Sequence, residues 1–139
     1  MFELFELLTK VNAQILRALS PLVKGYGLTV SELIILWKIN KQGSCKITDF
    51  AKGTGVPAST LTSLFDRLEA KELVERTHDE NDRRCILING TPKLTDLIHE
   101  AILMADEKLS PIQEGLSANF VDGLLKDLQT LQEQLKLIT

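Results

Sequence analysis

The chain has 139 residues with a formal net charge of −3, and 44% of its side chains are apolar. It contains no run of about 18 apolar residues, which excludes a membrane-spanning helix, and its acidic N-terminus does not resemble a signal peptide. Its two cysteines, Cys45 and Cys85, form neither a metal-binding spacing nor a disulfide framework, so we expect a reduced, cytoplasmic protein.

The first part of the chain predicts two helices. Residues 2–24 should form an amphipathic helix, and Pro21 should kink or interrupt it because proline lacks a backbone donor. Its apolar stripe is heptad-like and contains Leu4, Leu8, Val11, Ile15 and Leu22. A second, largely apolar helix should begin at a capping box formed by Thr29 and Glu32 and end near Gly43. Its composition predicts a central position.

The next stretch predicts two helices joined by a turn that contains glycine. The short first helix covers residues 47–52, the turn 53–55 and the second helix 57–71. The apolar positions of the second helix fall on one face: Leu61, Leu64, Phe65 and Leu68. Its polar residues lie outside that face: Ser59, Thr60, Thr62, Ser63, Asp66 and Arg67. Any two packed helices give this local pattern, and so does a helix-turn-helix whose second helix enters a DNA major groove.

A predicted β-hairpin follows these helices and favours the second interpretation. Residues 73–77 and 85–89 read as strands, and the charged loop 78–84 between them contains Arg83 and Arg84. A helix-turn-helix followed by such a hairpin is a winged helix. The predicted fold class is therefore mostly α with a small β-hairpin wing, a winged helix-turn-helix with N- and C-terminal dimerisation helices.

Two further helices complete the predicted fold. Thr91 and Pro92 are a typical helix start, Ser110 and Pro111 should limit or kink that helix, and Ser117 should cap the last one. The last helix has a heptad-like stripe at Val121, Leu124, Leu128, Leu131, Leu135 and Ile138. The terminal stripes exceed what a small winged-helix core can cover, so we expect them to pair with a second copy. An intramolecular three-helix cluster is the alternative.

The stretch from Ser63 to Thr91 resembles the signature of MarR-type transcriptional regulators. The motifs that carry this resemblance are Asp66-Arg67-Leu68-Glu69, Leu73-Val74 and the wing residues Asp82-Arg83-Arg84. In length and helix order the resemblance extends over the whole chain. It implies a single domain over residues 1–139, with a DNA-binding lobe at 29–91 and a helical dimerisation lobe at 1–25 and 92–139. It also implies a homodimer that binds pseudo-palindromic operators, often as a repressor released by a small aromatic or anionic effector.

Three positions depart from the family pattern. Glu72 stands where glycine is usual after the recognition helix, and a left-handed conformation there would cost glutamate roughly 1 kcal/mol. This favours a different helix ending. Ser63 stands where a basic residue is common, which removes one DNA contact, and Leu94 stands where a small residue is usual.

The candidate DNA-binding residues come from the helix and the wing. The major-groove candidates are Ser59, Thr60, Thr62, Ser63 and Arg67, whose hydroxyl and guanidinium groups could contact base edges or phosphates. The resemblance places a minor-groove arginine at Arg83 or Arg84 and a bracing acid at Asp82. The alternatives are a solvated helix face and a surface ion-pair cluster. Asp66 could accept a hydrogen bond from cytosine or hold Arg67 or a wing arginine in place. The dimerisation candidates are Leu4, Leu8, Val11, Leu124, Leu128, Leu131 and Leu135.

Other functions find little support in the sequence. No catalytic motif is present, His78 and His99 lack metal-ligand spacing, and we expect neither an enzyme nor a metal or cofactor site. Arg83 and Arg84 could lower the pKa of Cys85 and make it a redox sensor, although a packing role is the simpler interpretation. An effector pocket would lie near the aromatic residues Trp37, Tyr26 and Phe5, which are more often core residues.

The local charge balance keeps a second function open. Residues 46–93 contain eight basic and eight acidic side chains, so bulk charge gives DNA binding no support. The alternative is a helical dimer that binds a protein and acts as an anti-regulator, with weak or no DNA binding.

Overall fold

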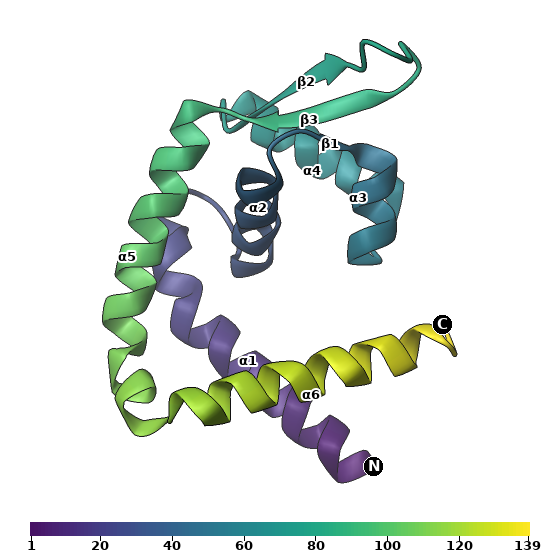
Figure 1. Ribbon diagram of the computed structural model, residues 1–139. Coiled ribbons are helices and arrows are strands. Elements are labelled where there is room, and N and C mark those ends of the chain that lie inside the picture. The colour runs from purple at the N-terminus through teal and green to yellow at the C-terminus, as the bar shows by residue number, and fades with distance from the viewer. The chain divides into compact units, whose positions relative to one another are not determined.

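The computed structural model describes residues 1–139 and contains six helices and three short strands (Figure 1). The helices are α1 (Phe2–Lys24), α2 (Val30–Gln42), α3 (Ile47–Thr54), α4 (Ala58–Ala70), α5 (Pro92–Gly115) and α6 (Ala118–Lys136). The strands are β1 (Cys45–Lys46), β2 (Val74–His78) and β3 (Ile86–Gly90). The chain divides into two compact units, Met1–Met104 and Ala105–Thr139, and α5 contributes to both. None of the helices is long and apolar enough to cross a membrane.

The predicted hairpin is present, and it belongs to a sheet with a third strand. The strand order is β1-β3-β2, all antiparallel, with Ile88 opposite both Cys45 and Arg76. Each hairpin strand begins one residue later than predicted. Strand β1 was not predicted because two residues are too few to show an alternating pattern. The hairpin projects from the same side of the first unit at which α3 and α4 lie (Figure 1).

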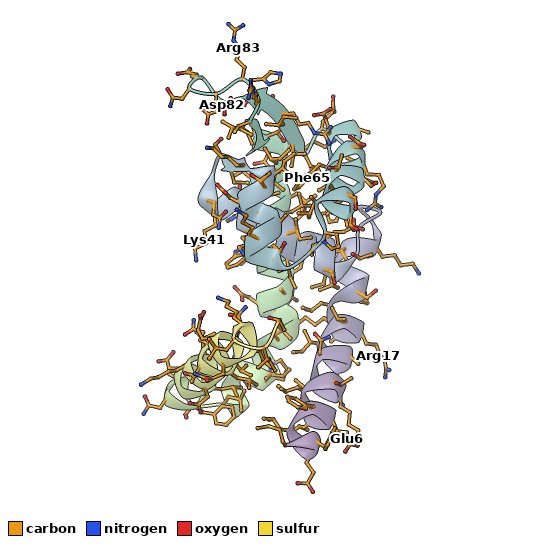
Figure 2. The ribbon with its side chains drawn as sticks, turned by 90° about the vertical axis from the view of Figure 1, so that its right-hand side faces the viewer. Glu6, Arg17, Lys41, Phe65, Asp82 and Arg83 are labelled. Carbon is orange, nitrogen blue, oxygen red and sulfur yellow. The ribbon has the colours of Figure 1, made fainter.

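The core of the first unit forms around the apolar face predicted for α4. Leu61, Phe65 and Leu68 are completely buried, and the rings of Phe65 and Phe50 make an edge-to-face contact with 6.0 Å between their centroids. Figure 2 shows Phe65 in the interior of this unit. Leu64, predicted to be buried with them, is only half-buried and faces a groove between α4 and α2. The buried face of α4 therefore fixes which residues remain available for a ligand.

Several helix ends differ from the predicted ones. Helix α1 continues through Pro21 to Lys24, and α5 continues through Pro111 to Gly115. Helix α3 continues to Thr54, so the turn predicted at 53–55 is reduced to Gly55. The caps of the other helices are as predicted: the Thr29, Thr91 and Ser117 side chains accept hydrogen bonds from backbone N–H groups of the first turn.

The unusual Leu94 is accommodated by a close approach to Gly90. Leu94 is completely buried, and a Cβ atom placed on Gly90 would lie 2.8 Å from Leu94 Cδ2. Because glycine has no side chain, the end of β3 can pass directly over the leucine. The large side chain at the start of α5 thus fills space that the backbone leaves open.

The recognition-helix candidate α4 ends in a left-handed glutamate. Glu72 has a φ of 60°, its N–H donates to Glu69 O, and Leu73 N–H donates to Leu68 O. This is a Schellman ending, and the expectation of a different ending is wrong. The turn at Glu72 directs the chain toward β2 and places the side chain of Leu73 in the core.

This strain gives a stability prediction. Glu72→Gly should raise the free energy of unfolding by about 1 kcal/mol, because glycine adopts a positive φ without strain. Glu72 Oε2 and Lys93 Nζ lie 3.7 Å apart, but both side chains are largely exposed, so loss of this pair costs little. Denaturant unfolding of both proteins at one fixed concentration measures the difference.

The control for this prediction is Gly55→Ala. Gly55 has a φ of 71° and nothing within 4 Å of an added Cβ, so its substitution changes only backbone strain. It should lower the free energy of unfolding by about 1 kcal/mol. A loss of stability in Glu72→Gly would show that the Glu72 side chain contributes more than its strain costs.

Candidate nucleic-acid interface

The outer face of α4 presents the predicted polar side chains to solvent. All five major-groove candidates are exposed: Ser59, Thr60, Thr62, Ser63 and Arg67. The hydroxyl of Thr62 donates to Ala58 O at 2.9 Å, so it can only accept from a ligand while that bond lasts. The face can therefore donate and accept hydrogen bonds, and it carries a single cation.

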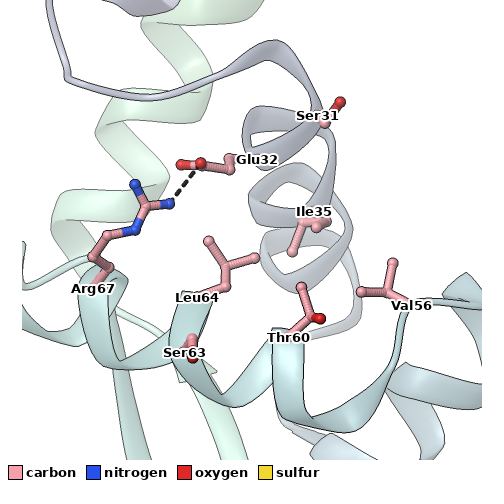
Figure 3. Close-up of a pocket in the computed structure, with 8 residues that line it drawn as sticks. All are labelled: Ser31, Glu32, Ile35, Val56, Thr60, Ser63, Leu64 and Arg67. Carbon is pink, nitrogen blue, oxygen red and sulfur yellow. Dashed lines mark hydrogen bonds and ion pairs between the residues drawn. The ribbon is translucent and has the colours of Figure 1, made fainter.

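Arg67 is held by an acid from another helix. Its Nη2 donates to Glu32 Oε1 of α2 at 2.6 Å, beside an open groove of about 410 Å³ between the two helices (Figure 3). Eight residues line the groove: Ser31, Glu32, Ile35, Val56, Thr60, Ser63, Leu64 and Arg67. The predicted capping box is only half formed: Glu32 N–H donates to Thr29 Oγ1, but the Glu32 carboxylate turns toward Arg67.

The sequence interpretation missed Arg76 as a residue that positions α4. Its guanidinium lies 2.7 Å from Asp66 Oδ1 and 3.6 Å from Glu69 Oε1, and its Nη2 donates to Thr62 O at 3.2 Å. Asp66 therefore holds neither Arg67 nor a wing arginine. A signal was available, because Arg76 lies two residues after the buried Val74 and so on the same face of β2. Strand β2 is thus tied to the exposed side of α4.

The wing presents two arginines that make no ion pair. Arg83 and Arg84 are exposed in the turn between β2 and β3, and Figure 2 shows Arg83 pointing away from the lobe at the tip of the hairpin. The nearby acid Asp79 binds other groups: its Oδ2 lies 3.5 Å from Lys46 Nζ, and its Oδ1 accepts from Asn81 N–H at 3.0 Å. The alternative of a surface ion-pair cluster at these arginines does not match the structure.

Asp82 stabilises the wing turn by accepting hydrogen bonds from backbone N–H groups of that turn. Its Oδ1 accepts from Arg84 N–H at 3.0 Å, and its carbonyl oxygen accepts from Cys85 N–H at 2.9 Å. His78 Nδ1 lies 3.1 Å from Arg83 O on the other side of the turn. The predicted bracing by Asp82 therefore acts on the turn that carries the arginines, and no contact to a guanidinium is present.

Both cysteines are free and half-buried, and neither has an activated thiol. Partial burial and then the Asp82 carboxylate raise the pKa of Cys85, and Lys46 only partly opposes them. The expectation that Arg83 and Arg84 lower this pKa is wrong. Burial also raises the pKa of Cys45, with a smaller contribution from Asp49. The thiolate fraction of both is therefore below that of an ordinary cysteine.

The aromatic residues near the expected effector pocket do not form one cluster. Trp37 is 43% exposed and Phe5 39% exposed, so neither is a core residue in the single chain. Tyr26 is half-buried, and its hydroxyl donates to Glu100 Oε2 at 2.6 Å, which raises the pKa of Tyr26. These positions do not assign an effector site.

The apolar stripes of α1 and α6 are open to solvent in the single chain. Five of the predicted dimerisation residues are exposed: Leu4, Val11, Leu124, Leu128 and Leu135. Leu8 and Leu131 are half-buried. No side chain of α6 is buried.

A helix-turn-helix with a polar exposed second helix, followed by a hairpin with free arginines, defines the first unit as a winged-helix lobe. Comparisons with known proteins give its family. The MarR family model matches residues 28–86. The uncharacterized HTH-type transcriptional regulator YsmB of Bacillus subtilis is 30% identical over 111 residues, which cover 80% of this chain and 76% of YsmB. The chain belongs to the MarR family of winged helix-turn-helix transcriptional regulators.

Two further relatives extend the comparison. The HTH-type transcriptional repressor MdtR of B. subtilis is 38% identical over 77 residues, which cover 55% of this chain and 49% of MdtR. The matched segment thus spans about half the length of MdtR. A cysteine-to-serine mutant of MarR from E. coli, solved in complex with operator DNA, has a TM-score of 0.80 at 24% identity, with 93% of each chain covered. This likeness shows that the fold extends over nearly the whole chain.

Proposed function

We propose that the protein binds a pseudo-palindromic operator in double-stranded DNA as a homodimer, with α4 in the major groove and wing residues 78–84 in the minor groove. The observation that carries this proposal is the pair of exposed wing arginines without acidic partners beside an exposed polar helix. A narrow minor groove concentrates negative potential and attracts arginine, which fits that arrangement. A MarR mutant of the same fold was solved in complex with operator DNA, which supports DNA as the ligand.

The exposed stripes on α1 and α6 support a dimer, because a second copy would cover them. Two recognition helices about 34 Å apart would then fit successive major grooves. We further propose repression, released by a small aromatic or anionic effector that changes this spacing. MdtR, named a repressor, supports repression; the effector remains a prediction of the family resemblance.

The test is a salt titration of DNA binding. Fluorescence anisotropy with a labelled fragment from upstream of the protein's own gene should give an affinity that falls at least tenfold between about 50 and about 200 mM salt. The reason is that phosphate contacts release counterions. Unlabelled fragment should compete better than a shuffled fragment of the same composition.

The competing proposal is a protein-binding anti-regulator, which the neutral charge of residues 46–93 favours. It predicts no salt-dependent binding to the upstream fragment at micromolar protein. That result would contradict the operator-binding proposal and direct the search to a protein partner.

A further inference from the structure

Arg67 is the only basic side chain of α4, and it forms an ion pair with Glu32 of α2. The Arg67 side chain is 53% exposed, whereas the Glu32 side chain is 14% exposed, and their contact distance is 2.6 Å. The acid is thus the more buried partner, and Figure 3 shows the two side chains directed toward each other from α2 and α4. Asp66, the neighbouring acid on α4, is engaged by Arg76 and does not compete for Arg67.

The partial burial of Glu32 favours retention of this pair. Arg67 binds Oε1, and the other carboxylate oxygen, Oε2, is buried without a hydrogen-bond partner. If Arg67 swung away toward a base, the Glu32 side chain, which is only 14% exposed, would lose its counter-charge while Oε2 stayed buried, which is unfavourable. Arg67 should therefore keep its contact with Glu32 when a ligand arrives.

The Arg67 guanidinium keeps free N–H donors while it binds Glu32. It carries five N–H groups, of which the contact with Glu32 uses one. Arg67 also lies in the third turn of α4, whereas recognition helices contact base edges mainly through their N-terminal residues. A fixed cation near the end of the helix suits the phosphate backbone at the groove edge better than a base.

We propose that Glu32 is a positioning residue, which holds Arg67 so that its remaining N–H groups bind a DNA phosphate without reading sequence. This inference rests on the proposed operator binding. It assigns Arg67 to the phosphate backbone, where the sequence left a phosphate and a guanine edge open. It also gives a role in DNA affinity to a residue of α2, outside the helix-turn-helix.

The test measures DNA affinity and its salt dependence for three variants: Glu32→Gln, Arg67→Gln and the double substitution. Arg67→Gln should weaken binding about tenfold on the upstream fragment and on the shuffled fragment alike, because a phosphate contact carries no sequence information. The log–log salt slope of a dimer should fall in magnitude by about two, one contact per protomer. Glu32→Gln should change affinity and slope in the same direction, and the double variant should bind no more weakly than Arg67→Gln.

Glu75→Gln is the matched control for charge. Glu75 lies exposed on β2 without an ion pair, so its substitution removes one negative charge from the same lobe and leaves Arg67 in place. General electrostatics predicts that removal of an acid leaves DNA binding unchanged or slightly stronger. Glu32→Gln should shift the affinity in the opposite direction, which separates positioning from bulk charge.

Arg67→Lys keeps the positive charge and leaves Glu32 unchanged, so it tests the inference even if Glu32→Gln unfolds the lobe. A lysine ammonium lacks the planar fork that binds an acid and a phosphate together, so affinity should fall about threefold or more on both fragments. The inference would be overturned by wild-type affinity in Arg67→Lys or by stronger binding in Glu32→Gln. Additive losses in the double variant, or a loss confined to the upstream fragment, would also overturn it. If the wild-type protein shows no salt-dependent binding, the proposed function itself fails.

Discussion

Replacement of Arg83 and Arg84 together by glutamine should lower the affinity for the operator about a hundredfold and leave the oligomeric state unchanged. Both side chains are exposed in the wing turn and make no ion pair, so they are free to enter a minor groove. A dimer would lose two arginines inserted in narrow minor grooves, where the potential strengthens the contact, and two further positive charges beside them. Anisotropy at one fixed salt concentration measures the loss, and size-exclusion chromatography checks the oligomeric state.

The control for the wing prediction is Arg17→Gln combined with Lys24→Gln. Both residues are exposed on α1, outside the candidate interface, and their substitution removes the same two positive charges per chain. Binding by this control should change less than about threefold, through long-range electrostatics alone. Unchanged binding by the Arg83 and Arg84 variant at the same salt concentration would contradict the assignment of the wing to the minor groove.

The parts of the fold that local periodicity determines were predicted correctly. The buried residues Leu61, Phe65 and Leu68 recur at helical spacing, and each wing strand is a short segment with one buried apolar residue, Val74 or Ile88. The helix caps at Thr29, Thr91 and Ser117 depend only on the next turn of the same helix. Such features follow from residues close in sequence, and no knowledge of tertiary contacts is needed.

The features that were missed depend on contacts between distant segments. Strand β1 exists because its two residues pair with β3, and Glu32 turns away from its own helix because Arg67 lies opposite it. Glu72 adopts a positive φ because the burial of Leu73 requires the turn, which propensity alone argues against. Each of these is a tertiary contact that overrides a local preference.

In the candidate site, too, the local features were predicted and the tertiary contacts were missed. The exposed positions of α4 followed from the helical period, and the resemblance placed the arginines of the wing. The connections that orient these groups did not follow: Arg76 binds Asp66 across two elements, and Asp82 binds the backbone of the turn. Two adjacent residues of α4 form ion pairs with different elements: Asp66 with Arg76 of β2, and Arg67 with Glu32 of α2. These two ion pairs join α4 to β2 and to α2 on either side of its buried face.

The largest effect on function is expected from the dimerisation stripe. Leu124→Glu combined with Leu128→Glu should convert a dimer into a monomer and lower the affinity for the operator by about a hundredfold or more. These residues are 46% and 38% exposed, so a single chain tolerates charge there, whereas an apolar interface would have to bury two carboxylates per subunit. Two linked heads bind far more tightly than one because the second binds at high effective concentration. Sedimentation or light scattering gives the mass, and anisotropy gives the affinity.

The matched control adds the same two negative charges to the same helix. Gln129→Glu and Gln132→Glu lie on α6 outside the apolar stripe and are exposed, so this variant should remain a dimer and bind like the wild type. Circular dichroism and thermal unfolding distinguish dissociation from loss of structure, because the first unit has its own core around Phe65. A Leu124 and Leu128 variant that stays dimeric would show that α6 is not the interface. A monomeric variant with wild-type affinity would show that one winged-helix lobe suffices for binding, which would remove the reason for a palindromic operator.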